Sequence, residues 1–394
     1  MSVFPSDLRA LFPAVKRRTY LNAAASSPLA TTVALAIEAH LNDTVENGDV
    51  HFAEWLAFRE SLRGKVATFI GATPPEVAFL GSTSAGFSAV ASLWSQRGIR
   101  RVLTLEGEFP STTIPLLQAG MSLEVVRPRP DGATLAEQLD DALNAQVGAV
   151  AVSAVQFASG YRLDLEAVSR VCAERKVPWA VNAARALGQV PIDVAKLGCD
   201  FLAAPSHKWM LGGFGVGIFY AKAGTLQGVK LPWSGWFSTP DALRWDAFAG
   251  AQKSRESVKG FLAKGVSVRA EASALEASMS WGALHGLGAG VEILSTIGVP
   301  GVLEHNIGMQ LLLRAGLRSA GFVPNTPDEE AGMSGICVVP VEGDLSAAVR
   351  ALFKEGVVTS PRGGGVRIST HIFNDESDVE KALAAFDALG LKPK

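Results

Sequence analysis

The segment APSHKWMLGGFGVGIFY, residues 204–220, places one lysine between two short apolar runs. Lys208 follows the run at 201–204, and a glycine-rich turn separates it from a second run at 215–220. Short apolar runs bounded by Gly and Pro are typical of buried strands, so we expect this lysine just past the end of a strand. A partly desolvated amine at such a place loses its proton and can attack an aldehyde. A single lysine in a loop is more often an ordinary surface residue, so the rest of the chain has to support this role.

Short apolar runs alternate with helix-like segments on the N-terminal side of Lys208. The predicted strands are 77–80, 101–105, 123–127, 147–153, 179–182 and 201–204, and the predicted helices are 32–46, 53–70, 86–97, 134–145 and 164–175. Strands that alternate with helices favour a parallel or mixed sheet covered on both faces. The sequence therefore predicts an α/β fold with a mixed, mostly parallel sheet.

The pattern changes after about residue 222. Residues 228–268 are rich in Trp, Gly and Ser and have no clear period. Helices are then predicted at 272–296 and 300–320, followed by a strand at 334–341, a helix at 344–355, a strand at 365–369 and a helix at 375–388. We expect an N-terminal arm over 1–20, a large domain over 21–265 and a smaller C-terminal α+β domain over 266–394.

The composition is that of a globular enzyme. The 394 residues are 48% hydrophobic and carry a formal net charge of −2, which gives no reason to expect nucleic acid or an acidic membrane as a partner. Three widely spaced cysteines form neither a disulfide framework nor a metal-ligand cluster, so we expect no metal and a reducing compartment. The N-terminus has no apolar core of a secretory signal, and no uncharged run is long enough to span a membrane. These features predict a cytoplasmic protein.

The turn GSTSA at 81–85 is a candidate anion site. It follows a predicted strand and opens a helix, so its backbone N–H groups and the positive end of the helix suit a phosphate dianion. Ser82, Thr83 and Ser84 add hydroxyl donors. A simple helix N-cap is the commoner explanation of such a turn taken alone.

Three further side chains have chemistry that suits a ligand site. Phe109 offers a flat apolar face, although core packing would explain it too. His207 is placed to bind a phosphate or to order Lys208, although it could equally be a satisfied loop histidine. Arg367, at a predicted strand end, can grip a carboxylate in bidentate fashion, although a surface ion pair is the alternative.

Six motifs in this order resemble the class V aminotransferase family, which includes cysteine desulfurases, kynureninase-like enzymes and isopenicillin N epimerase-like proteins. They are YLNAAASSPL (20–29), GSTSA (81–85), EFPS (108–111), VNAARALGQVPID (181–193), SHKW (206–209) and VRIS (366–369). One of these motifs would be weak, whereas six in sequence cover nearly the whole chain.

The resemblance implies a fold type I, pyridoxal-5'-phosphate (PLP) dependent transferase, with Lys208 carrying the cofactor as a Schiff base (the internal aldimine). It implies that Ser82, Thr83, Ser84 and His207 hold the phosphate, that Phe109 stacks on the ring, and that Asn22 and Arg367 lie at the substrate. It also implies a homodimer with shared active sites, in which Trp236 reaches the neighbouring subunit's site. The partner would be a small-molecule amino-acid substrate.

The chain departs from the family's pattern at Asn182, Arg185, Pro205 and Met279, and the resemblance places the first two at the cofactor ring. Asn182 stands where the family normally has an Asp that keeps the ring nitrogen protonated, so we expect a weaker electron sink. Arg185 stands where the family usually has a Gln near the ring hydroxyl, and its guanidinium could stabilise the phenolate. A neutral amide can either donate to an unprotonated ring nitrogen or accept from a protonated one, and the sequence leaves both open.

The motifs predict an amino-acid enzyme without fixing its reaction. Transamination, C–S or C–Se lyase-like β-elimination and epimerisation share their first step, and we favour the first two. The segment 356–367 contains no cysteine, and Cys172, Cys199 and Cys337 fall in predicted helix or strand contexts, which disfavours a persulfide mechanism. A catalytically degenerate PLP-binding or scaffold protein is the alternative that the departures suggest. A nucleotide-dependent α/β enzyme is disfavoured, because the chain has no G-x-x-x-x-G-K-[ST] loop.

Overall fold

The computed structural model describes residues 6–127, 135–240, 268–326 and 328–394. Its centre is a seven-stranded sheet in the order β2-β8-β7-β6-β5-β3-β4. The strands are β2 (Val77–Leu80), β3 (Arg101–Leu105), β4 (Ser122–Val126), β5 (Ala149–Ser153), β6 (Trp179–Asn182), β7 (Phe201–Pro205) and β8 (Gly217–Ala221). The five strands β7, β6, β5, β3 and β4 run parallel to one another, and β8 is antiparallel to both β7 and β2. The predicted mixed, mostly parallel sheet is confirmed.

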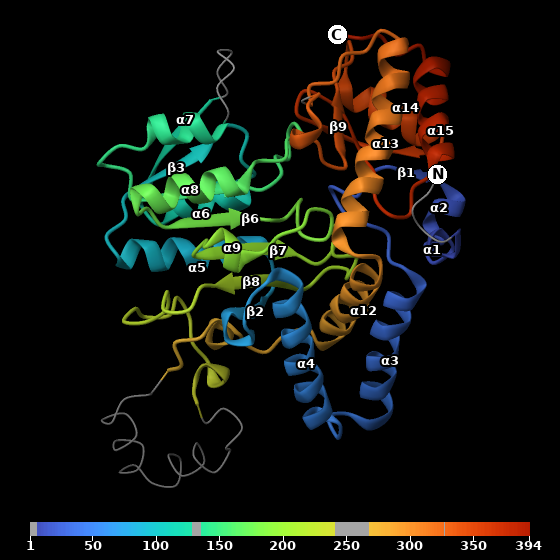
Figure 1. Ribbon diagram of the computed structural model, residues 1–394. Helices are drawn as coiled ribbons and strands as arrows, with labels where there is room; N and C mark the ends of the chain where they lie inside the picture. The colour runs from blue at the N-terminus through green and yellow to red at the C-terminus, as the bar shows by residue number, and fades with distance from the viewer. Residues whose placement is uncertain (1–5, 128–134, 241–267, 327) are drawn as a thin grey trace, which may run out of the picture.

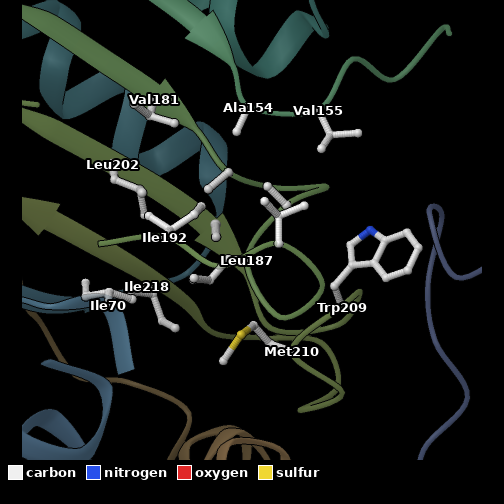
Figure 2. Packing of buried hydrophobic residues seen from close by; sticks show 14 of the residues in the cluster. Ile70, Ala154, Val155, Val181, Leu187, Ile192, Leu202, Trp209, Met210 and Ile218 are labelled. Carbon is white, nitrogen blue, oxygen red and sulfur yellow. The ribbon is translucent and has the colours of Figure 1, made fainter. Parts of the chain in front are cut away.

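Both faces of this sheet are buried, and alternate residues of each strand serve different cores. In β5, Val150 and Val152 join the larger core, whereas Ala149 and Ala151 join the core beneath helix α5 (Thr83–Gln96). This follows from the two-residue period of a strand. Figure 2 shows part of the larger core, where side chains of the sheet lie beside residues of the loop that follows β7.

Helices cover the two faces and extend below the sheet (Figure 1). Helices α5 and α6 (Pro110–Gln118) pack together on one face, and α7 (Leu135–Ala142), α8 (Leu165–Arg175) and α9 (Val194–Leu197) lie on the other. A third group packs together on the larger core, namely α3 (Thr31–Asn47), α4 (Phe52–Ile70) and α12 (Trp281–Ile297).

A second α+β unit follows α12. Its antiparallel sheet has the order β11 (Ser360–Arg362), β12 (Gly365–Ser369), β9 (Ile336–Val339), and α13 (Val299–Ser319), α14 (Leu345–Lys354) and α15 (Glu376–Ala388) enclose its core. The N-terminal elements lie against this unit (Figure 1): α1 (Ser6–Ala10) and α2 (Ala14–Arg17) precede β1 (Thr19–Tyr20), which pairs with β10 (Val357–Val358). The predicted domain boundary at residue 265 lies outside the described residues, and the three-part division stays a prediction.

Several predicted bounds needed correction. The helix predicted over 86–97 begins at Thr83, because the Ser82 side chain accepts the Ala85 N–H and caps it. The helix predicted over 272–296 begins at Trp281 and is preceded by a 3-10 turn, Ala272–Leu275. The physical reason is Glu276, whose extended backbone directs its carboxylate to Arg63 and to the Phe79 N–H. Helix α6 was not predicted.

Within the described ranges, no single helix is long and apolar enough to cross a membrane. Helices α12 and α13 meet the length and composition criteria only as a pair, and the two helices are bent by 79° at their junction.

Candidate active site

The loop that carries Lys208 begins where β7 ends and is clamped from three sides. The Ser206 N–H donates to Val216 and the Gly212 N–H donates back to Ser206, which closes the turn between β7 and β8. The carbonyl of His207 accepts the Ser27 N–H at 2.9 Å, so the N-terminal segment lies directly on this loop. From below, α12 approaches so closely that a Cβ at Gly290 would stand 2.2 Å from the Met210 carbonyl oxygen. The lysine is therefore held on a rigid support.

Lys208 is buried in a cationic environment. Its side chain is 9% exposed, and its Nζ lies 5.8 Å from the centroid of the Phe109 ring. Within the described residues, no hydrogen bond or ion pair reaches this amine. Burial, with the positive charges of Arg185 and Arg367, lowers its pKa to about 7. A substantial share of this amine is therefore uncharged and nucleophilic at neutral pH.

The predicted phosphate turn opens α5 at the carboxyl end of β2. Ser82 is the N-cap, and Ser84 donates to the Ser111 hydroxyl at 3.0 Å. Thr83 is 6% exposed, and its Oγ1 has no hydrogen-bond partner in the described part of the chain. A buried hydroxyl without a partner at a helix N-terminus is what an anion would satisfy.

Phe109 is the shared neighbour of the site's cations. The Cζ of Arg185 lies 4.8 Å from its ring centroid, and Phe157 meets it edge-on at 5.2 Å. Arg185 is 4% exposed, and its Nε has no partner among the described residues. Desolvation lowers the pKa of Arg185 to about 9, with further lowering by the charge of Arg367. Phe109 thus packs against Arg185 and Phe157, and a flat ring bound on Phe109 would lie close to Arg185.

Asn182 is the last residue of β6, and the turn that follows it carries Arg185 and packs against the Lys208 loop. This contact is tight: Gly188 has φ +101°, and a Cβ there would stand 2.2 Å from the Trp209 carbonyl oxygen. Figure 2 shows Leu187, from the same turn, beside Trp209 and Met210 of the lysine loop. The two loops therefore form one packed unit.

A hydrogen-bonded chain that the motif analysis missed runs behind Asn182. The Asn182 Nδ2 donates to the Thr112 hydroxyl at 2.8 Å, and that hydroxyl lies 3.3 Å from a carboxylate oxygen of Glu108. Glu108 also accepts hydrogen bonds from Ser153 and Gln156. Burial raises the pKa of Glu108, and these hydrogen bonds oppose the rise. The quoted motif EFPS contains Glu108, and an acidic residue three positions after the end of an apolar strand was the signal available in the sequence.

Arg367 and Asn22 are brought to the carboxyl end of β12, the central strand of the C-terminal sheet. Arg367 is 1% exposed, donates to the Phe157 carbonyl at 3.3 Å, and keeps an Nε without a partner in the described residues. Asn22 forms a bridge with Ser369, two residues beyond Arg367, and its Oδ1 is likewise buried without a partner there. Burial lowers the pKa of Arg367 to about 10, which leaves it charged at neutral pH.

Two predicted residues lie at the periphery. The His207 ring stacks on Phe214 at 4.1 Å, and burial with the charge of Lys208 lowers its pKa to about 4, so it is neutral at pH 7. Trp236 packs against Phe52 at the start of α4 and against Phe237. Trp236 is predicted to reach the site of a neighbouring subunit, and the structure contains a single chain, so this role stays a prediction.

The arrangement fits PLP. An aldehyde would meet the Lys208 amine, a phosphate would satisfy the Thr83 hydroxyl at the start of α5, and a flat ring would cover Phe109. Neither Arg185 nor Arg367 forms an ion pair with a carboxylate of a described residue, and burying two uncompensated guanidinium groups is costly. An anionic ligand would remove that cost. No cluster of three or more possible metal-ligating side chains occurs in the described ranges.

The three thiols of the chain are buried and lie outside the set of side chains described above. Cys172, Cys199 and Cys337 are all free and at most 2% exposed. Burial raises the pKa of Cys337 to about 11 and that of Cys172 to about 12. A thiolate nucleophile needs exposure and a lowered pKa, and these three cysteines have neither.

Comparison with known proteins gives a consistent result. The family model for aminotransferase class-V matches residues 19–382. An uncharacterized aminotransferase, YcbU, from Bacillus subtilis is 26% identical over 97% of both chains. A probable cysteine desulfurase from Methanothermobacter thermautotrophicus is 25% identical over 95% of both. Among solved structures, an apo cysteine desulfurase from Thermococcus onnurineus superposes with a TM-score of 0.85 over 99% of both chains at 22% identity.

Proposed function

Because the chain belongs to the class-V aminotransferase family, a family of PLP-dependent enzymes, we propose that it transforms an amino acid at its α-carbon by transamination or by β-elimination. The observation that carries the proposal is Lys208: a buried amine with a pKa near 7, beside an aromatic face and two guanidinium groups that form no ion pair with a carboxylate of the described residues. Burying Lys208, Arg185 and Arg367 together costs stability, and a scaffold protein would have no ligand to compensate that cost.

Bound PLP supplies an electron-withdrawing ring that stabilises negative charge at the substrate's α-carbon. The protein's part is to bind, orient and move protons. Arg367 holds the substrate carboxylate, because its buried guanidinium offers a planar pair of donors. Lys208 Nζ would remove the α-proton and deliver it to a different atom from the α-carbon, because an amine with a pKa near the working pH is an effective acid and base. Thr83, together with Ser82 and the start of α5, anchors the cofactor phosphate.

The cysteines favour direct elimination over a persulfide route as the lyase-type alternative. The relative from Methanothermobacter is named a probable cysteine desulfurase, and a persulfide route requires an accessible thiol in the enzyme itself. All three thiols of this chain are buried. A lyase reaction here would therefore expel its leaving group without forming an enzyme persulfide.

We also propose a homodimer with shared sites, as the resemblance implies. Trp236 would then lie near the neighbouring subunit's cofactor. Size-exclusion chromatography with light scattering would measure the assembly, and a monomer with full activity would contradict this part of the proposal.

The test has two stages. Purified protein is mixed with PLP, reduced with borohydride and digested; we expect the reduced adduct on the peptide that contains Lys208. Lys208→Ala should abolish it, whereas the exposed Lys222→Ala serves as the matched control. Absence of any adduct in the unaltered protein would refute the function.

In the second stage, a panel of amino acids is tested with and without a keto acid. Conversion that depends on the keto acid identifies transamination, and ammonia or sulfide released without it identifies elimination. Interconversion of L and D forms with neither would identify epimerisation and contradict both.

A further inference from the structure

The orientation of the Asn182 side chain is fixed by its neighbours. Its Oδ1 accepts the Ala184 N–H at 3.0 Å, and its Nδ2 donates to the Thr112 hydroxyl at 2.8 Å. Rotating the amide by half a turn would set two N–H donors, Nδ2 and Ala184 N, against each other. The oxygen therefore already accepts one hydrogen bond inside the protein, and the second Nδ2 proton, which has no acceptor among the described residues, is the donor that this amide can offer to a ligand.

Thr112 and Glu108 impose the same orientation from the other side. Thr112 is fully buried, and its single hydroxyl proton faces the Glu108 carboxylate at 3.3 Å. Because that proton is donated to the carboxylate, the Thr112 oxygen must accept from Asn182. The backbone N–H and the hydroxyl of Ser153 hold Glu108 in place, at 2.6 and 2.5 Å. Glu108 and Thr112 are thus positioning residues for the amide.

Arg185 lies three residues after Asn182, in the same turn, and shares Phe109 with Lys208. Its Cζ lies 4.8 Å from the Phe109 centroid and 5.2 Å from that of Phe157. The charged groups around it are Glu108, Arg362, Arg367 and Lys208, so it stands among more cations than anions. A guanidinium only donates hydrogen bonds and stays charged, so what it lacks is an anionic acceptor.

We propose that this chain binds PLP with the ring nitrogen unprotonated, accepting the free N–H of Asn182, and with the anionic 3-oxygen of the ring accepting from Arg185. The reason is that an N–H donor can pair only with a nitrogen that has a free lone pair. In PLP the 3-oxygen is next to the carbon that carries the aldehyde, and Arg185 lies against the same Phe109 ring as Lys208, the amine that meets that aldehyde.

In this arrangement the charged side chain of the protein lies at the ring oxygen and not at the ring nitrogen. The family's usual pattern is a carboxylate at the ring nitrogen and a neutral amide at the ring oxygen, whereas this chain has a neutral amide and a guanidinium. The proposal rests on the proposed function. It deepens that function, because a ring without a proton on its nitrogen withdraws electrons less strongly and narrows the reactions that the site supports.

The experiment uses PLP labelled with ¹⁵N in the ring and the full-length protein. The ¹⁵N chemical shift of the bound ring reports directly whether the nitrogen carries a proton, without requiring turnover. We expect an unprotonated shift between about pH 6 and pH 9. Asn182→Asp should move it to the protonated value, and Asn325→Asp, which adds the same charge at an exposed position, should not.

The other variants separate the roles. Arg185→Gln should weaken PLP binding by roughly 10-fold and bring a titration of the bound chromophore toward neutral pH. Thr112→Val and Glu108→Gln should broaden or shift the ¹⁵N signal while PLP stays bound, and Thr112→Ser should restore it. A structural role alone would not move that signal.

Two results would overturn this inference and leave the proposed function standing. The first is a protonated ring nitrogen in the unaltered protein. The second is an Arg185→Gln variant whose bound-PLP spectrum is unchanged and which loses activity only toward substrates that carry a second acidic group. The latter would assign Arg185 to the substrate. Failure to bind PLP at all would refute the proposed function and this inference together.

Discussion

Lys208 and Arg185 are two buried cations that share one aromatic neighbour, at 5.8 Å and 4.8 Å from the centroid of the Phe109 ring. The charge of Arg185 and the burial of Lys208 both disfavour the protonated lysine. As a result, part of the Lys208 amine is uncharged and reactive at neutral pH, and its protonation depends on the charge of Arg185.

The first prediction concerns the pH dependence of adduct formation at Lys208. The pKa of Lys208 is lowered from 10.5 to about 7, so the rate of PLP adduct formation should rise with a midpoint near pH 7. Arg185→Gln removes a positive neighbour and should move the midpoint to higher pH. Stopped-flow absorbance after mixing with PLP measures it. Midpoints near pH 10 in both proteins would contradict the assigned environment.

The same shift has a consequence for stability. Unfolded Lys208 keeps its proton up to its ordinary pKa, whereas folded Lys208 loses it above about pH 7. The unfolded state therefore binds more protons between these two values, and the stability of the PLP-free protein should rise with pH across that window. Urea unfolding at several pH values, compared with Lys208→Met, would show it. If the variant keeps the same slope, the effect belongs to other groups.

The second prediction concerns Thr83. Replacing it with Val keeps its shape and removes a buried hydroxyl that has no partner in the described chain, so the folded protein loses no internal hydrogen bond. We expect PLP affinity to fall by roughly 10- to 100-fold, the range for a hydrogen bond to a charged group. Fluorescence quenching by PLP measures it. Ser84→Ala is the control, because Ser84 already donates to Ser111; an equal loss there would argue against a specific role for Thr83.

The third prediction separates substrate binding from cofactor binding. Arg367→Gln should raise KM for the amino acid by roughly 10- to 100-fold with little change in PLP affinity, because its guanidinium is assigned to the carboxylate. Steady-state kinetics and a PLP titration measure the two quantities. Arg362→Gln, at an exposed neighbouring position, should have a smaller effect. An unchanged KM in Arg367→Gln would remove Arg367 from the substrate site.

The fourth prediction concerns the buried ion pair that ends the 3-10 turn. Arg63 donates to Glu276 at 2.5 Å and 3.0 Å, and the Phe79 N–H donates to the same carboxylate at 2.8 Å. Glu276→Leu leaves Arg63 buried without that partner and should lower the free energy of unfolding by about 3–5 kcal/mol. The double variant with Arg63→Met should recover part of it. Denaturant unfolding tests this, and additive losses would show that the two side chains act independently.

The sequence motifs indicate the parts of the site that depend on local chain geometry. Lys208 follows a strand, and Thr83 begins a helix after another strand; such an order can be read from hydrophobic periodicity and turn residues alone. Thr112 could not be predicted from the sequence, because α6 has Pro115 within it and shows no clear helical period. Phe109 was predicted and its neighbour Glu108 was not, since the partners of a buried acid come from distant segments.

What the sequence determined by itself was the α/β order of elements, the lysine at the end of β7 and the hydroxyl-rich start of α5, because each depends on residues close together in the chain. Tertiary structure decided the charge of the site. Only folding joins the ends of β3, β6 and β7 with β12, so that Lys208, Arg185 and Arg367 are buried side by side and desolvation lowers their pKa values. Only folding, too, sets the Asn182 amide, because its two partners lie on the next turn of the chain and on a separate helix.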